Sequence, residues 1–348
     1  MVSALISPMP VVASLQRPAW ARASWLLVGS AVLVVLCALS VSFGVREVGF
    51  GDIVAALGGH DDTLAQAAVI KRIPRTVLAL LVGASLALSG ATMQAVTRNP
   101  VADPGILGVS NGASLAVVCG IAFFSIRNPY GQMTLAIVGA ALAAAFVYTV
   151  GSLGRGGATP LKLALAGAAT SAAFASLISA VMLPRVDALP AFQSWQIGGV
   201  GGAEWPRIAI TAPVLALGAL ICFASAKGMN SLALGDEMAR GLGEQVFRTR
   251  LVSALGAVIL AGAATAIAGP IGFVGLVIPH ACRLLIGTDH RWLLPFSALA
   301  GAGLLLASDI IGRVVSPGSE EIQVGIITAI IGAPFFIWIV RRQRVREL

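Results

Sequence analysis

Residues 72–113 read RIPRTVLALLVGASLALSGATMQAVTRNPVADPGILGVSNGA, and they decide the fold class. The run from 74 to 96 is mostly apolar, with Arg75 as its one charged residue, and is long enough to cross a bilayer, which takes about 20 helical residues. A polar turn follows, in which Pro100 and Pro104 are expected to end one helix and start the next. The side chains of Asn99 and Asp103 can satisfy the backbone groups freed there. The stretch therefore predicts two membrane helices joined by a short structural turn.

The rest of the chain repeats this pattern of apolar runs and short polar turns. Hydrophobic residues make up 57% of the 348 and charged residues only 11%, whereas soluble proteins have about a quarter charged residues. The apolar runs are continuous and do not alternate with polar residues, which excludes a transmembrane barrel. We predict an all-α polytopic membrane protein with about ten transmembrane helices. The predicted spans are residues 24–43, 74–96, 106–124, 133–150, 161–183, 207–225, 250–269, 272–287, 293–311 and 322–340.

The distribution of charge predicts the orientation. With the N-terminus inside, most of the 23 Lys and Arg residues fall in cytoplasmic segments, as the positive-inside rule requires. We therefore expect a multi-pass protein of the cytoplasmic membrane with both termini in the cytoplasm. The net charge of +8 fits this role better than binding to nucleic acid. The predicted parts are a cytoplasmic segment 1–23, one transmembrane domain 24–340 and a basic tail 341–348.

Two segments predict an internal repeat. GASLALSG (83–90) and GAATAIAG (262–269) match at four of eight positions with an offset of 179, and Pro100 falls on Pro279 at the same offset. They lie in the second and seventh spans, which must run in opposite directions. This predicts an inverted repeat of spans 2–5 and 7–10, as in many transporters. The alternative is that small residues at these positions only allow close helix packing.

Several classes of active site are missing from the sequence. It contains no G-x-x-x-x-G-K-[ST] motif for binding ATP, no nucleophile–base set and no cluster of metal ligands. We predict no enzymatic activity, no cofactor and no metal. Asp309 is the one candidate acid within a span, and we expect it to form a surface ion pair with Arg313. An ion-coupled secondary transporter, which usually needs more intramembrane ions, remains the less favoured alternative.

The longest predicted cytoplasmic loop, residues 226–250, contains NSLALGDEMARGLG (230–243). This segment predicts two short helices, the first capped by Asn230 or Ser231 and the second with Asp236 and Glu237 in its first turn. An exposed amphipathic element of this kind needs a partner. Its predicted apolar side consists of Leu232, Leu234, Met238 and Leu242.

Four motifs, at 72–113, 230–243, 268–295 and 325–340, together resemble the permease family of ABC importers for iron–siderophores, haem and cobalamin. The resemblance covers almost the whole chain in the family's order. It implies a permease subunit of a prokaryotic importer, with iron–siderophore complexes as the expected substrate and haem or cobalamin as the alternative. It also implies a dimer in the lipid bilayer, formed with an identical or related permease chain. Two ATPase subunits, which bind ATP and Mg, and an extracytoplasmic substrate-binding protein complete the expected assembly.

The resemblance also assigns roles to residues of this sequence. It implies that 230–243 couples the chain to the ATPase, and that arginines at the outer face dock the binding protein through paired carboxylates. Interfacial snorkelling is the alternative for the arginines, and Pro74 is expected to start the second span. The coupling residues are Asn230, Leu232, Leu234, Gly235, Glu237, Ala239, Arg240, Leu242 and Gly243. The docking residues are Arg72, Arg75 and Arg313. The pathway residues, which can equally be helix contacts, are Gly167, Ser171, Ala175, Thr328 and Gly332.

Overall fold

The computed structural model describes residues 18–44, 48–100, 102–126, 128–153, 159–185, 187, 189–316 and 321–342. Most of the predicted N-terminal segment, residues 1–17, and residues 343–348 of the predicted tail lie outside the described residues. Within the described ranges, every regular element is helical. The helices are α1 (Ala19–Ser42), α2 (Phe50–Leu57), α3 (Leu64–Thr97), η1 (Pro104–Leu107), α4 (Val109–Phe124), α5 (Pro129–Ser152), α6 (Pro160–Met182), α7 (Leu189–Ile197), α8 (Trp205–Ala224), α9 (Ala226–Ala233), α10 (Asp236–Gly241), α11 (Val246–Ala268), α12 (Val274–Ile286), α13 (His290–Val314) and α14 (Val324–Arg342).

The predicted spans correspond to helices of the structure. Seven helices, α1, α3, α5, α6, α8, α11 and α13, are long and apolar enough to cross a membrane. The other three predicted spans coincide with the shorter apolar helices α4, α12 and α14. The all-helical membrane fold is therefore confirmed. Helices α2 and α7 were not predicted, because each is too short to give a clear apolar run.

Helix α3 begins ten residues before the predicted start of the second span. Thr63 caps it, and Gln66 completes a capping box by accepting from the backbone N–H of Thr63. Pro74 therefore lies inside the helix, and the prediction that it starts the span was wrong. The Thr-x-x-Gln pattern was the signal that would have located the true start. At about 1.5 Å per residue, the 34 residues of α3 reach roughly 50 Å, so this helix links both ends of the bundle.

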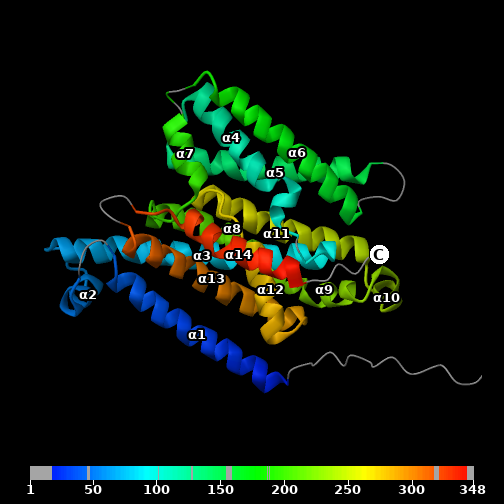
Figure 1. Cartoon of the computed structure of the whole chain (residues 1–348), viewed down its shortest axis with the longest axis horizontal. Helices are drawn as coiled ribbons and strands as arrows, with labels where there is room; N and C mark the ends of the chain where they lie inside the picture. The colour runs from blue at the N-terminus through cyan, green and yellow to red at the C-terminus, as the bar shows by residue number, and fades with distance from the viewer. Residues whose placement is uncertain are drawn as a thin grey trace, which may run out of the picture.

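Helix α3 runs through the centre of the bundle, with α4, α5, α6 and α7 grouped on one side and α1 on the other (Figure 1). Its neighbours approach closely at glycines. A side chain at Gly83 would overlap the backbone of Gly301 in α13, and one at Gly90 would overlap Gly275 in α12. Small residues at such crossings allow helix backbones to come into contact. Close packing therefore accounts for both glycines of the GASLALSG segment.

Two pairs of residues that the proposed repeat matches differ in local structure. Gly269 ends α11 with φ of 73°, whereas its proposed counterpart Gly90 lies inside α3. Pro279 is likewise inside α12, whereas Pro100 lies in a turn. The four positions therefore do not share local structure, and the inverted repeat of spans 2–5 and 7–10 remains a prediction.

The polar turn after α3 has the structural role predicted for it. Arg98 ends α3 in the left-handed conformation, and the Asp103 carboxylate accepts a hydrogen bond of 2.8 Å from the N–H of Gly105 in η1. Gly108, with φ of 68°, then leads into α4. The amide of Asn111 donates across to the carbonyl of Ser171 in α6 at 3.4 Å. The segment is a packed turn between two helices.

Candidate functional site

The predicted coupling segment forms two short helices at one end of the bundle, which we call the coupling end. Helices α9 and α10 meet at Gly235, whose φ of 104° permits the tight turn between them. Asp236 and Glu237 occupy the first turn of α10, as predicted. Gly243, with φ of 82°, makes the second turn before α11. The two-helix prediction is confirmed, with its first helix starting earlier than expected at Ala226.

The apolar residues of this segment divide between two faces. Leu232 and Ala239 are fully buried and form a small core with Val246. Leu234, Met238 and Leu242 are exposed by 58%, 63% and 66%, and we call them the apolar triad. The prediction that Leu232 belongs to the exposed side was wrong, because this residue packs inward. The predicted Glu237 and Arg240 are exposed beside the triad.

Asn230 joins α9 to the start of α13. Its amide nitrogen donates to Asp289 Oδ1 at 2.7 Å, and its Oδ1 accepts from the N–H of His290 at 2.9 Å. His290 Nδ1 lies 2.8 Å from the same oxygen and must be the protonated nitrogen, because an amide oxygen only accepts. Because α9 spans Ala226–Ala233, Asn230 lies inside the helix. The prediction that Asn230 or Ser231 caps this helix was therefore wrong. We call this contact the α9–α13 joint.

Asp289 has several partners besides Asn230. It caps α13 through the N–H of Arg291 at 3.1 Å, and Arg22 of α1 lies 3.6 Å from its second oxygen. Burial by itself would raise the pKa of Asp289, but the hydrogen bonds from Asn230 and Arg291 and the charge of Arg22 lower it overall. The carboxylate is therefore ionised at neutral pH and holds α1, α9 and α13 together.

A second contact links the coupling end to α3. Asp236 accepts from Arg250 Nη2 at 2.8 Å and lies 3.7 Å from Arg98 Nη1. Because these groups are partly exposed, the two ion pairs contribute little stability. They nevertheless place α10 beside the turn that ends α3.

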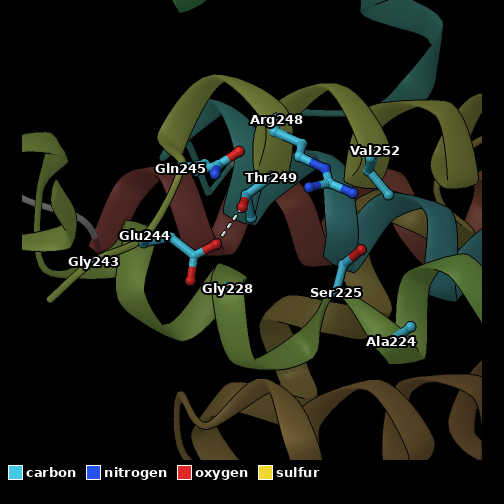
Figure 2. A pocket seen from close by; sticks show the side chains of 9 residues that line it. All are labelled: Ala224, Ser225, Gly228, Gly243, Glu244, Gln245, Arg248, Thr249 and Val252. Carbon is cyan, nitrogen blue, oxygen red and sulfur yellow. Dashed lines mark hydrogen bonds between the residues drawn. The ribbon is translucent and has the colours of Figure 1, made fainter.

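A hollow of about 340 Å³ separates part of α9 from the first turns of α11 (Figure 2). Arg248 extends across it, and the carboxylate of Glu244 accepts a hydrogen bond from the hydroxyl of Thr249 below. At the edge of this hollow, Gly228 of α9 packs so closely against Thr249 of α11 that a side chain there would overlap it. Met229 and Leu232 of α9 are fully buried. Helix α9 is therefore held by its contact with α11, by these buried side chains and by the α9–α13 joint.

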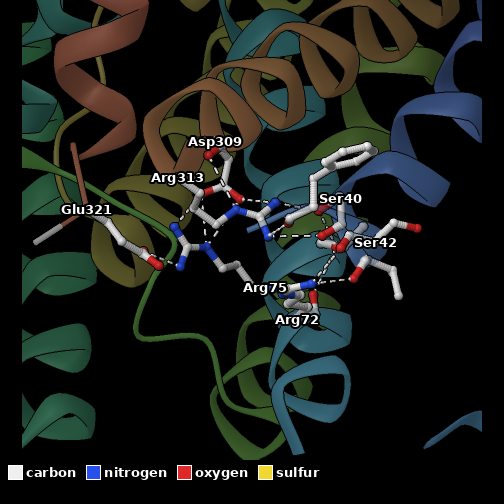
Figure 3. Close-up of polar contacts among 10 residues, drawn as sticks. Ser40, Ser42, Arg72, Arg75, Asp309, Arg313 and Glu321 are labelled. Carbon is white, nitrogen blue, oxygen red and sulfur yellow. Dashed lines mark hydrogen bonds and ion pairs between the residues drawn. The ribbon is translucent and has the colours of Figure 1, made fainter. Parts of the chain in front are cut away.

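Arginines gather at the opposite end of the bundle, which we call the arginine end (Figure 3). Arg75 in α3 forms a bidentate pair with Asp309 in α13: Nη2 donates to Oδ1 at 2.8 Å, and Nε lies 2.9 Å from Oδ1 and 3.2 Å from Oδ2. Its Nη1 bonds Glu321 Oε2 at 2.5 Å. Asp309 also pairs with Arg313 Nη2 at 3.0 Å. The predicted pair of Asp309 and Arg313 exists, but the expectation of a surface pair was wrong, because both side chains are almost completely buried.

The other two predicted docking arginines bind the end of α1. Arg313 Nη1 donates to the carbonyls of Ser40 and Phe43 at 2.9 and 3.1 Å, and Arg72 Nη1 donates to those of Val41 and Ser42 at 2.9 Å. The last carbonyls of a helix lack partners within the helix, so cationic donors stabilise them. The sequence shows these arginines but does not show that they would cap α1.

The three predicted docking arginines differ in how much of each side chain is exposed to solvent. Arg72 and Arg313 are buried, the Arg75 side chain is 13% exposed and the Glu321 side chain is 33% exposed. Sequence reasoning missed Glu321, which has no regular pattern around it to mark it. Docking by the three arginines remains a prediction, and Arg75 is the member through which a partner could reach the cluster.

The predicted pathway residues lie on two helices that are apart within the chain, α6 and α14 (Figure 1). Gly167 and Thr328 are buried, and Gly332 packs so tightly against Phe273 that a side chain there would overlap it. Ser171 is half-buried, whereas Ala175 is exposed. The pathway role of these residues remains a prediction.

Comparison with known proteins gives consistent matches. The chain matches the FecCD transport family over residues 32–342. It is 40% identical over 321 residues to the iron(3+)-hydroxamate import system permease protein FhuB of Bacillus subtilis (strain 168), covering 92% of this chain and 83% of that protein. It is 41% identical over 314 residues to the ferric enterobactin transport system permease protein FepD of Escherichia coli (strain K12), covering 90% and 93%. A solved structure of a metal-chelate type ABC transporter in an inward-facing conformation superposes with a TM-score of 0.79 and 30% identity, covering 92% of this chain and 99% of that chain.

Proposed function

The chain belongs to the FecCD transport family, and the two relatives compared above are permeases of an import system and a transport system. We propose that it is the permease of an importer for iron–siderophore complexes. In this proposal the chain binds no ATP itself and forms a dimer with an identical or related permease. Two ATPase subunits and an extracytoplasmic binding protein complete the importer. The relatives named for iron(3+)-hydroxamate and ferric enterobactin, both of high coverage, support this substrate class.

We place the coupling end in the cytoplasm. It carries Arg98, Arg240, Arg248 and Arg250 among its described residues, and cytoplasmic segments of membrane proteins are rich in Lys and Arg. The arginine end then faces outward. Its arginines do not contradict this, because they are neutralised by acids or used to cap α1.

The apolar triad supports the coupling role. Leu234, Met238 and Leu242 stand in contact with solvent at an end of the bundle that is too polar to enter the membrane. Three large exposed apolar side chains on one short segment mark a protein interaction site. In the importer they would insert into a groove of the ATPase, with Glu237 and Arg240 at the rim.

The arginine end would receive the binding protein, with Arg75 as the contact. A guanidinium pairs with a carboxylate in a directional, bidentate manner and therefore sets the register of docking as well as its affinity. The substrate would then pass between two copies of the permease, along surfaces that include α6 and α14. Ala175 and Ile330 are exposed on these helices in the single chain.

An assembly experiment tests the coupling role. Replacing the apolar triad by serine should reduce co-purification with the ATPase subunit at least tenfold and leave thermal stability unchanged, because these side chains are exposed. The matched control replaces Phe50, Val54 and Leu57, equally exposed apolar residues of α2, and should not affect assembly. Full assembly of the triad variant would show that the ATPase docks elsewhere.

A further inference from the structure

The two acids that bind Arg75 differ in how firmly they are held. Asp309 is completely buried, accepts two bonds from Arg75 and also pairs with Arg313. Among the residues that the structure describes, Glu321 accepts only from Nη1 of Arg75, and its side chain is one-third exposed. Removing one partner of a buried ion pair strongly destabilises a protein, whereas a partly exposed partner can be exchanged at little cost. The Nη1 contact is therefore the replaceable part of the cluster.

We propose that Glu321 occupies, in the free permease, the place on Arg75 that a carboxylate of the binding protein takes on docking. Glu321 thus acts as an internal competitor that lowers the affinity for this partner. The exchange is chemically balanced, because one charge-assisted N–H···O⁻ bond breaks and an equivalent bond forms. The bidentate pair with Asp309 stays intact and keeps Arg75 oriented. This inference rests on the proposed docking at the arginine end.

The geometry leads from Glu321 directly to α14. The N–H of the next residue, Ile322, donates to the carbonyl of Gly312 in α13 at 3.2 Å, and the N–H of Gly325 donates to the carbonyl of Gly198 at 3.3 Å. Residues 321–323 thus form a short strap that leads into α14, and three contacts hold it: those of Glu321 and Ile322, and that of Gly325 in the first turn of α14. Exchange at Arg75 would remove the first of these contacts. Docking would then be sensed by α14, a helix of the proposed pathway.

The affinity of the binding protein tests the competitor role. The experiment uses the complete permease–ATPase complex in lipid nanodiscs and measures the Kd of the substrate-loaded binding protein. Glu321→Gln should tighten docking about five- to tenfold, because a neutral amide is a weaker competitor than a carboxylate for the guanidinium. Glu321→Asp, which keeps the charge but shortens the side chain, should tighten docking by a smaller factor of about two.

Glu204 provides the matched control. It is an exposed acid at the start of α8, three residues from Gly201, which lies near Arg75 Nη1. Glu204→Gln removes the same charge from the same face without touching the cluster and should change the Kd less than twofold. Equal tightening by both variants would show a general field effect and overturn the competitor role.

Further outcomes separate this inference from the docking proposal. Arg75→Gln should weaken docking at least tenfold if the proposed docking site is correct. If Arg75→Gln weakens docking while Glu321→Gln leaves it unchanged or weakens it, docking at Arg75 stands and the competitor role is refuted. If Arg75→Gln assembles fully with the ATPase and docks normally, the docking site itself is wrong. The Glu321 variants stay informative if Arg75→Gln does not assemble, because Glu321 is partly exposed and its loss leaves the Asp309 pair in place.

Discussion

The α9–α13 joint gives the most specific prediction for how motion of the coupling end reaches the membrane helices. Asn230→Ala removes one hydrogen bond to the ionised Asp289 and two bonds from His290 to the amide oxygen. A bond to a charged group contributes about 1.5–3 kcal/mol and a neutral bond about 0.5–1.5 kcal/mol. Asp289 keeps Arg22 and the N–H of Arg291, so we take a net loss of about 3 kcal/mol.

That loss has a measurable consequence for the local opening of α9. Since about 1.4 kcal/mol corresponds to a factor of ten, the population of α9 detached from α13 should rise about a hundredfold. Hydrogen exchange of the α9 amides in nanodiscs should accelerate by about this factor, while exchange in α5 stays unchanged. In proteoliposomes with ATPase and binding protein, ATP hydrolysis should continue while the substrate transported per ATP falls.

Two variants make this prediction decisive. Ser231→Ala is the control, because its hydroxyl only reaches the carbonyl of Lys227 at 3.4 Å. The exchanged pair Asn230→Asp with Asp289→Asn reverses the bond across the joint: the amide at 289 donates to the carboxylate at 230, which still accepts from His290. This double variant should restore slow exchange and coupling. Unchanged exchange and unchanged transport per ATP in Asn230→Ala would refute the reasoning.

Further predictions concern pH, packing and the buried ions. Because the pKa of Asp289 is lowered in the folded protein, the ionised carboxylate contributes its full stabilisation above about pH 4 and loses it as the pH falls through the folded pKa. Hydrogen exchange in α9 should therefore accelerate in that acidic range. Asp289→Asn should abolish this pH dependence. Gly90→Ala would place a methyl group against the backbone of α12 and should destabilise the chain by about 1–3 kcal/mol, measured by thermal unfolding in detergent, whereas Gly241→Ala, with open space around it, should not. Asp309→Asn should cost about 3–5 kcal/mol in the same assay, because two arginines lose their buried counter-ion; a melting temperature equal to that of the wild type would contradict the buried network.

The sequence predicted the fold well because membrane helices carry their signal in continuous apolar runs. Each of the ten predicted spans coincides with a helix, and the segment 230–243 forms two helices as expected. The start of α3 was predicted less well, because Pro74 was taken as the first residue of the second span although it lies inside the helix. The capping pair Thr63 and Gln66 marks the true start of α3.

The candidate site was only partly predictable, because side-chain partners come from distant segments. Asn230 has the residue type of a helix cap, but its amide bonds Asp289, 59 residues away. The position of Arg313 near the end of a predicted span indicates an exposed cation. In the structure it is buried against the carbonyls at the end of α1, 270 residues or more away. Local patterns contain no information about such contacts, which depend on how the helices pack.

Uptake by the reconstituted importer tests the central claim most directly. The chain is placed in liposomes with its ATPase subunits, ATP is enclosed on their side, and labelled ferric siderophore is supplied with the binding protein on the opposite side. The account predicts accumulation that requires hydrolysable ATP and the binding protein, and that haem or cobalamin does not compete away. Accumulation that proceeds without ATP and follows an imposed proton or sodium gradient would contradict it.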